Sequence, residues 1–152
     1  YNPLVAMLCL NGAHVDSYGL TVLSLDPAAP EGLQVNVDDE WIDIPYVEAS
    51  LVLNVGALLS RWTNGMWKAS VHRVLCRPGR RLSIVSGAVR PGDDVLVEVL
   101  GPCAAASARG AAFPPVLARE YYAERVAMHR PSYLDERGTT TGLERDMLAA
   151  DI

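Results

Sequence analysis

The chain has 152 residues, of which 50% are apolar and 20% charged, and its formal net charge at pH 7 is −5. This length predicts one domain with a buried core, and the composition is that of an ordinary globular protein. The acidic balance argues against nonspecific binding to nucleic acid, because no surplus of basic side chains is available to neutralise phosphates. No apolar run reaches transmembrane length, so we expect no membrane partner.

The three cysteines, Cys9, Cys76 and Cys103, lie far apart and form no CxxC pair. A sparse, odd set predicts no disulfide framework and favours a reducing, cytoplasmic location. We expect these side chains to be buried as small apolar groups. Because the chain starts at Tyr1, inside an apparent strand, we expect it to be a fragment or processed product of a longer protein.

Short strands separated by turns are predicted over the first hundred residues. Apolar runs and apolar–polar alternation indicate strands over 4–10, 20–25, 33–37, 40–44, 50–56, 70–76, 81–89 and 94–100. Asp38 and Asp39 predict a hairpin turn, and a short helix is expected over 57–65, closed by Asn64 and Gly65. About eight short strands with such turns predict a sandwich or barrel, of which the jelly roll is the eight-stranded form.

The composition changes after Gly101. Small residues over 101–115 predict a loop, and the spacing of Val116, Tyr121 and Val126 predicts a helix over 115–129 that packs on the barrel. We therefore divide the chain into a core, residues 1–100, and a C-terminal loop and helical segment, residues 101–152.

The histidines separate into different roles. His129 ends the predicted helix, where a cation is explained by the helix dipole. His14 precedes Asp16 by two positions, a pattern that is typical either of metal ligands or of a turn capped by aspartate. His72 lies on a predicted strand. Two imidazoles and one carboxylate on one face of a metal are the ligands of non-haem Fe(II) oxygenases.

Arg81 and Ser83 lie two residues apart and therefore on the same face of a strand. A guanidinium beside a hydroxyl suits the distal carboxylate of a dicarboxylate. The alternative is an arginine on the barrel surface, the role that we expect for Arg80.

Five stretches, AHVDSYGLTVLSL, GLQV, EWIDIP, LVLNVGALLSRWTNGMWKASVHRV and RLSIV, resemble the isopenicillin N synthase-like family of Fe(II)/2-oxoglutarate-dependent oxygenases. The resemblance covers roughly residues 1–100 and, more loosely, the predicted helix. It implies a mainly β fold, a double-stranded β-helix (jelly-roll) core with a C-terminal helix, without the N-terminal helical part of the family.

The same resemblance implies the site residues and the reaction. His14, Asp16 and His72 match the metal ligands, and Arg81 and Ser83 match the pair that holds the C5 carboxylate of 2-oxoglutarate. The implied enzyme is a dioxygenase that uses Fe(II), 2-oxoglutarate and O₂ to oxidise a small organic molecule, with release of succinate and CO₂. Ascorbate is left open as a further cofactor, as are the substrate, the reaction outcome and the oligomeric state.

Two positions depart from the family pattern. Asn2 stands where a tyrosine that touches 2-oxoglutarate is usual, and Ala57 replaces the aspartate of an NxGD motif, which we expect to loosen hydrogen bonds that support the site. Two alternatives stay open. Some family members retain the arginine–serine pair but do not use 2-oxoglutarate, and a non-catalytic jelly-roll module is favoured by Ala57 and opposed by the intact ligand set.

Overall fold

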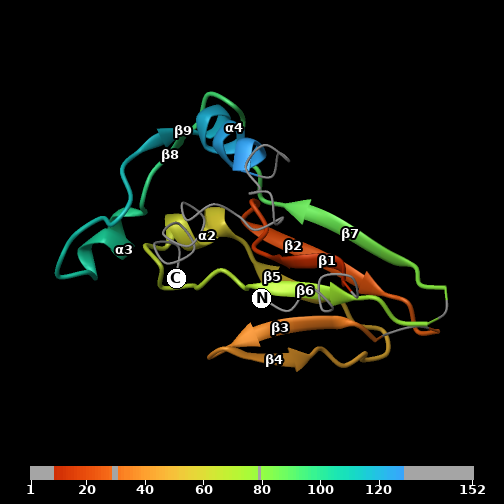
Figure 1. Cartoon of the computed structure of the whole chain (residues 1–152). Helices are drawn as coiled ribbons and strands as arrows, with labels where there is room; N and C mark the ends of the chain where they lie inside the picture. Colours follow the sequence, from red (N-terminus) through yellow and green to blue (C-terminus); the bar gives the residue numbers. More distant parts are fainter. Residues whose placement is uncertain (1–8, 29–30, 79, 129–152) are drawn as a thin grey trace, which may run out of the picture.

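The computed structural model describes residues 9–28, 31–78 and 80–128, and it is mainly β (Figure 1). One antiparallel sheet has the strand order β1-β6-β3-β4 and a second has the order β5-β2-β7, while β8 and β9 form a separate pair. The strands are β1 Cys9–His14, β2 Leu20–Leu25, β3 Leu33–Val37, β4 Glu40–Asp43, β5 Val52–Val55, β6 His72–Leu75, β7 Ser83–Ala88, β8 Leu96–Val97 and β9 Val116–Leu117. The helices are α2 Ala57–Trp62, α3 Gly101–Ala105 and α4 Ala118–Met128.

The two larger sheets face each other and enclose an apolar core. Strand β2 alternates, with Thr21, Leu23 and Leu25 buried, as expected for a strand with one face toward a core. Leu23 and Leu25 pack against Leu33 of β3, which belongs to the other sheet. The double-stranded β-helix predicted from the sequence is thus confirmed.

The β3–β4 hairpin closes at the predicted turn. Asp38 and Asp39 have φ angles of 49° and 66°. Positive φ at both central residues is the geometry of a type I′ turn, whose twist matches that of the strands it joins.

A second cluster joins α2 to the C-terminal helix. Leu58 of α2 packs with Val97, Ala118 and Tyr121, all of which are buried. Figure 1 shows α4 beyond the end of the sheets, on the same side of the molecule as α2. Tyr121 is thus buried, but its neighbours in this cluster belong to α2, β8 and α4, whereas packing on the barrel was predicted.

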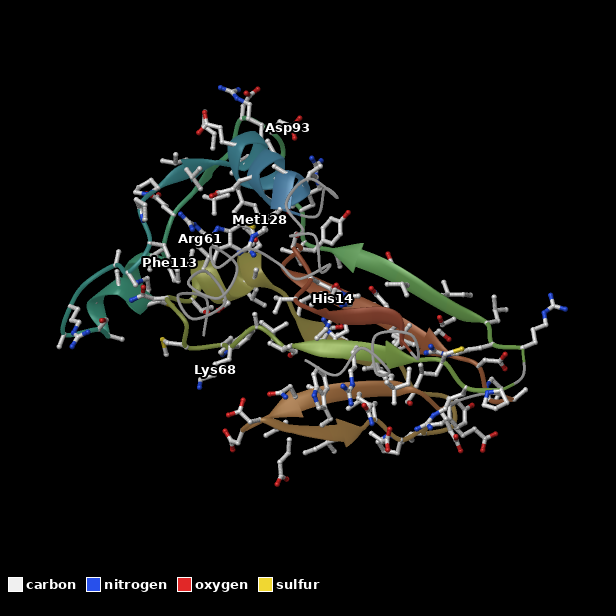
Figure 2. The ribbon with its side chains drawn as sticks, viewed as in Figure 1. His14, Arg61, Lys68, Asp93, Phe113 and Met128 are labelled. Carbon is white, nitrogen blue, oxygen red and sulfur yellow. The ribbon has the colours of Figure 1, made fainter. Side chains whose placement is uncertain are left out.

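Helix α2 also anchors the segment that follows α3. The guanidinium of Arg61 lies 5.2 Å from the ring centroid of Phe113, and its Nη2 donates to the carbonyl oxygen of Pro114 at 2.6 Å (Figure 2). A cation over an aromatic face and a hydrogen bond to the next residue fix this segment beside the helix. The described residues just after α3 are therefore joined to α2.

Several expectations for the second half need correction. The strand expected over 94–100 is limited to Leu96–Val97, which pairs with β9 and not with the barrel sheets. Val116 lies in β9, so α4 begins only at Ala118, and Val126 is exposed. The loop expected over 101–115 contains α3, which Pro102 favours because proline is tolerated in the first turn of a helix. His129 lies outside the described residues.

Exposure also differs from expectation at one of the cysteines. Cys76 is exposed and Cys103 is half-buried, so the prediction of buried thiols was wrong for Cys76 and was met only in part at Cys103, while the side chain of Cys9 lies outside the described part of the structure. Arg80 is exposed, as predicted. None of the helices in the described ranges is both long and apolar enough to cross a bilayer.

Candidate metal centre

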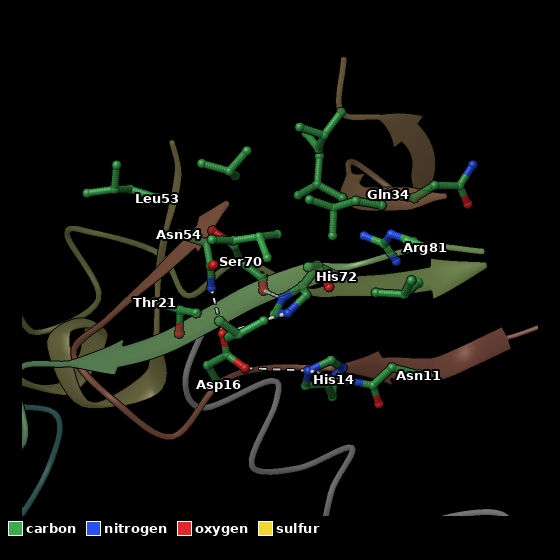
Figure 3. A pocket seen from close by; sticks show the side chains of 18 residues that line it. Asn11, His14, Asp16, Thr21, Gln34, Leu53, Asn54, Ser70, His72 and Arg81 are labelled. Carbon is green, nitrogen blue, oxygen red and sulfur yellow. Dashed lines mark hydrogen bonds and ion pairs between the residues drawn. The ribbon is translucent and has the colours of Figure 1, made fainter. Parts of the chain in front are cut away.

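His14, Asp16 and His72 converge at one end of the β1–β6 pair (Figure 3). His14 ends β1, His72 begins β6, and the register of the two strands makes these residues Cα partners. Their ring centroids are 4.2 Å apart. Asp16 follows in the next turn, and one potential ligand atom from each of the three residues lies within 4.8 Å of the other two.

Both histidines are oriented by their own backbone. The Nδ1 atom of His14 contacts the carbonyl oxygen of Gly12 at 2.8 Å, and Nδ1 of His72 contacts that of Ser70 at 2.9 Å. A carbonyl only accepts hydrogen bonds, so each Nδ1 carries a proton, and Nε2 is the ring nitrogen that can bind a metal ion once it is deprotonated. This second hydrogen bond is the usual device that prepares a histidine for metal binding.

The two Nε2 atoms face the carboxylate of Asp16. Nε2 of His14 is 3.4 Å from Oδ1, and Nε2 of His72 is 3.7 Å from Oδ2. Adjacent ligands of an octahedral ion at about 2.1 Å lie about 3 Å apart. The observed separations therefore need only a small contraction to hold a divalent ion.

Asp16 is held as a carboxylate. Burial opposes its ionisation, but hydrogen bonds with His14 and Asn54 and the charge of His72 outweigh burial, so the pKa of Asp16 lies well below its usual range. The hydrogen bond to Asp16 in turn raises the pKa of His14, against the opposing effect of burial. An ionised carboxylate between imidazoles is a strong attraction for a metal cation.

A cavity of about 240 Å³ opens from the three ligand candidates and runs between the two sheets. Ser83, the first residue of β7, and Arg81, two positions before it, also line this cavity, so the structure brings both together with the histidines and Asp16. Nε of Arg81 is buried and has no hydrogen-bond partner among the described residues. A buried guanidinium N–H without an acceptor is what a carboxylate ligand would satisfy.

The charges that line the cavity are balanced. Asp16 and Arg81 are its only charged residues apart from the histidines in the described part of the chain. A divalent cation together with a dianionic dicarboxylate adds no net charge to this pair. The residues present therefore fit Fe(II) and 2-oxoglutarate taken together, because buried charges are stable only when paired.

Three amide side chains that the sequence analysis did not single out also line the cavity. Asn54 donates a hydrogen bond to Asp16, Asn11 lies 3.3 Å from Nε2 of His14, and Gln34 links β3 to its neighbours through Arg73 and Asp43. The available signal for Asn54 was its polarity within the otherwise apolar run LVLNV. A polar residue on a buried strand face calls for a partner inside the protein.

The departure at Ala57 is accommodated in the structure. Ala57 is fully buried beside Val15 and Ala69, and its backbone N–H donates to the carbonyl oxygen of Asp16 at 2.8 Å. This support for the metal-binding turn comes from the backbone and needs no side chain at position 57. The other departure, Asn2, lies outside the described residues.

Comparisons with known proteins agree with this geometry. The family model of the 2OG-Fe(II) oxygenase superfamily matches residues 9–87. A 1-aminocyclopropane-1-carboxylate oxidase of Diospyros kaki is 41% identical over 86 residues, which are 56% of this chain and 26% of the relative. The 2-oxoglutarate-dependent dioxygenase caaD of Aspergillus niger is 42% identical over 77 residues, 49% of this chain and 24% of the relative.

Solved structures show the same fold. The dioxygenase for auxin oxidation from rice superposes with a TM-score of 0.71 at 27% identity, covering 84% of this chain and 43% of that protein. A full-length Neurospora crassa protein in complex with alpha-KG gives a TM-score of 0.68 at 29% identity, covering 78% and 38%. The chain spans about a quarter of the length of the curated relatives. With a family match that extends from β1 to β7, and a jelly-roll barrel in which two histidines, an aspartate and an arginine line one cavity, the chain belongs to the 2OG-Fe(II) oxygenase superfamily.

Proposed function

We propose that this chain is the catalytic core of an Fe(II)- and 2-oxoglutarate-dependent dioxygenase that oxidises a small organic molecule. His14, Asp16 and His72 bind the iron, and Arg81 with Ser83 holds the distal carboxylate of 2-oxoglutarate. The observation that carries the proposal is the convergence of the three ligand side chains on one cavity that Arg81 also lines, with a buried Nε that has no hydrogen-bond partner among the described residues.

The residues divide the work between metal and cosubstrate. Bound Fe(II) supplies the activation of O₂ that couples decarboxylation of 2-oxoglutarate to oxidation of the substrate. The protein binds the metal through neutral imidazoles, whose Nδ1–H groups stay fixed on the backbone. Arg81 orients the cosubstrate by a charge-assisted contact, and the apolar walls, which include Leu23, Leu33 and Val74, exclude water.

The test is an anaerobic titration of the Fe(II)-loaded protein with 2-oxoglutarate. We expect a visible metal-to-ligand charge-transfer band that saturates at one equivalent, followed, after O₂ is admitted, by succinate formation. A protein that fails to bind Fe(II) would contradict the proposal. Iron binding without this band at saturating 2-oxoglutarate would contradict only the proposal that 2-oxoglutarate is the cosubstrate.

The second candidate is an iron oxidase of the same superfamily that does not use 2-oxoglutarate. The relatives at 41–42% identity that are named 1-aminocyclopropane-1-carboxylate oxidase favour it. The same titration separates the two candidates, because the second predicts iron binding without a charge-transfer band.

A further inference from the structure

We propose that Asn54 is a positioning residue that fixes the Asp16 carboxylate in the orientation required for metal binding, an inference that rests on the function proposed above. Nδ2 of Asn54 donates to Oδ2 of Asp16 at 2.9 Å, across 38 positions of sequence (Figure 3). Both side chains line the cavity. A donor to an ionised acceptor forms a stronger hydrogen bond than a neutral pair does.

The amide is itself held in place by the sheet. Asn54 is the register partner of Thr21 in the β2–β5 pair, which fixes its backbone beside the turn that carries Asp16. The next residues hold the same turn through their backbone. Gly56 N–H donates to the carbonyl of Gly19 at 2.9 Å, and Ala57 N–H donates to that of Asp16. The segment from β5 to α2 thus forms hydrogen bonds with both the main chain and the carboxylate of Asp16.

The hydrogen bond from Asn54 makes the two carboxylate oxygens of Asp16 unequal as metal ligands. Oδ2 accepts the Asn54 amide and lies 3.7 Å from Nε2 of His72, whereas Oδ1 lies closer to its histidine, 3.4 Å from Nε2 of His14, so Oδ1 is the oxygen with more free lone pairs for the ion. We infer that Asp16 binds through one oxygen. Without the amide, the terminal torsion of the carboxylate, which is intrinsically broad, becomes free to turn. Loss of such a supporting partner typically weakens metal binding about 10- to 100-fold.

The experiment compares Mn(II) affinities, measured from the electron paramagnetic resonance signal of free Mn(II), in the wild-type chain and three variants. Asn54→Ala removes the amide, and Asn54→Leu removes the donor while keeping most of the volume. Asn36→Ala is the matched control, because Asn36 is also a strand residue but lies outside the cavity lining. We expect about 10- to 100-fold weaker binding in both Asn54 variants, and wild-type affinity in the control.

A role in folding alone is distinguished by measuring affinity where circular dichroism shows each variant to be folded. Wild-type Mn(II) affinity in a folded Asn54 variant would overturn the inference and leave the proposed function intact. Failure of the wild-type chain to bind Mn(II) would overturn both. The Mn(II)-induced infrared difference spectrum of the wild type gives an independent check, which needs no variant to fold. We expect the widely split carboxylate stretches of single-oxygen binding, and a two-oxygen signature would overturn the inference.

Discussion

Each histidine of the site contacts a backbone carbonyl two residues earlier through Nδ1, which leaves Nε2 for the proposed metal ion. The contacts of His14 with Gly12 and of His72 with Ser70 span only two residues, so they form as soon as the local backbone is in place. The carboxylate of Asp16 differs, because its support comes from Asn54 on another strand. Histidine orientation is therefore a local property, whereas aspartate orientation depends on the barrel.

The separate roles of His72 and Arg81 lead to different expected effects of substitution. His72→Ala removes one of three ligands and should abolish Mn(II) binding with little change in the circular dichroism spectrum. Arg81→Ala leaves the ligands in place, so metal binding should persist while the 2-oxoglutarate concentration required for succinate formation rises. Calorimetric titration with each ligand measures both. Equal losses of metal binding in the two variants would contradict the assignment.

At the scale of elements, the turn from Asp16 to Gly19 is held by parts of the chain that are distant in sequence. The β5–α2 junction approaches this turn so closely that a Cβ atom on Gly56 would lie 2.0 Å from the carbonyl oxygen of Tyr18. Helix α4 reaches the same turn, because the hydroxyl of Tyr121 donates to the carbonyl of Ser17 at 3.1 Å. The turn that carries Asp16 is thus contacted both by the β5–α2 junction and by α4.

Substitution at Gly56 should show how tightly these elements are packed. In Gly56→Ala the added methyl group meets backbone atoms that cannot move without displacing Asp16, and we expect a loss of about 1–3 kcal/mol in the free energy of unfolding. Metal affinity should fall as well. Gly101→Ala is the control, because a Cβ atom there meets nothing within 4 Å. Urea denaturation of the metal-free proteins measures the difference, and equal stabilities would refute the close approach.

The two adjacent tyrosines of α4 form a natural pair for testing the contact with the turn. Tyr121→Phe removes the hydrogen bond to Ser17 and should lower the free energy of unfolding by about 1 kcal/mol. Tyr122→Phe should have no such cost, because the buried hydroxyl of Tyr122 has no hydrogen-bond partner among the described residues. Chemical denaturation of both variants provides the measurement. If Tyr122→Phe lowered the free energy of unfolding more than Tyr121→Phe, the stabilising role assigned to the Tyr121 hydroxyl would be wrong.

For the whole molecule, the cavity couples metal binding to the stability of the barrel. Its lining comes from strands of both larger sheets, so an ion held by His14, Asp16 and His72 bridges β1 and β6 next to the second sheet. An apolar exposed surface remains on that second sheet, where Ile84 and Val85 of β7 are 66% and 63% exposed. The site thus lies where the two sheets meet and not on one sheet alone.

Metal should therefore stabilise the folded chain by mass action. At a free Mn(II) concentration of about 100 times its Kd, the free energy of unfolding should rise by about 2.7 kcal/mol, provided that the unfolded chain does not bind the ion. Thermal melts with Mn(II), with a chelator, and with the His72→Ala variant measure this. If Mn(II) stabilised His72→Ala as much as the wild type, the ion would not be bound by His72.

Much of the fold was predictable where the local pattern is strong. The alternation of β2 and the Asp38–Asp39 turn were predicted correctly, because side-chain periodicity and turn chemistry act over a few residues. The strand over 94–100 and the extent of the last helix were not, because apolar residues there pack on α2 and on β9, and the sequence does not reveal those neighbours. Apolar character alone does not distinguish a strand from other buried segments.

The sequence by itself determined the types and order of the groups at the site: two imidazoles, one carboxylate, and an arginine two residues before a serine. Side-chain chemistry and the two-residue period of a strand are local properties, so they can be predicted without the fold. Only the tertiary structure decided that Asn54 and Tyr121 support the turn of Asp16, and that Nε of Arg81 is buried without a partner among the described residues. The Asn54–Asp16 hydrogen bond spans 38 positions of sequence, and the Tyr121–Ser17 hydrogen bond spans 104. Both depend on sheet register and helix packing.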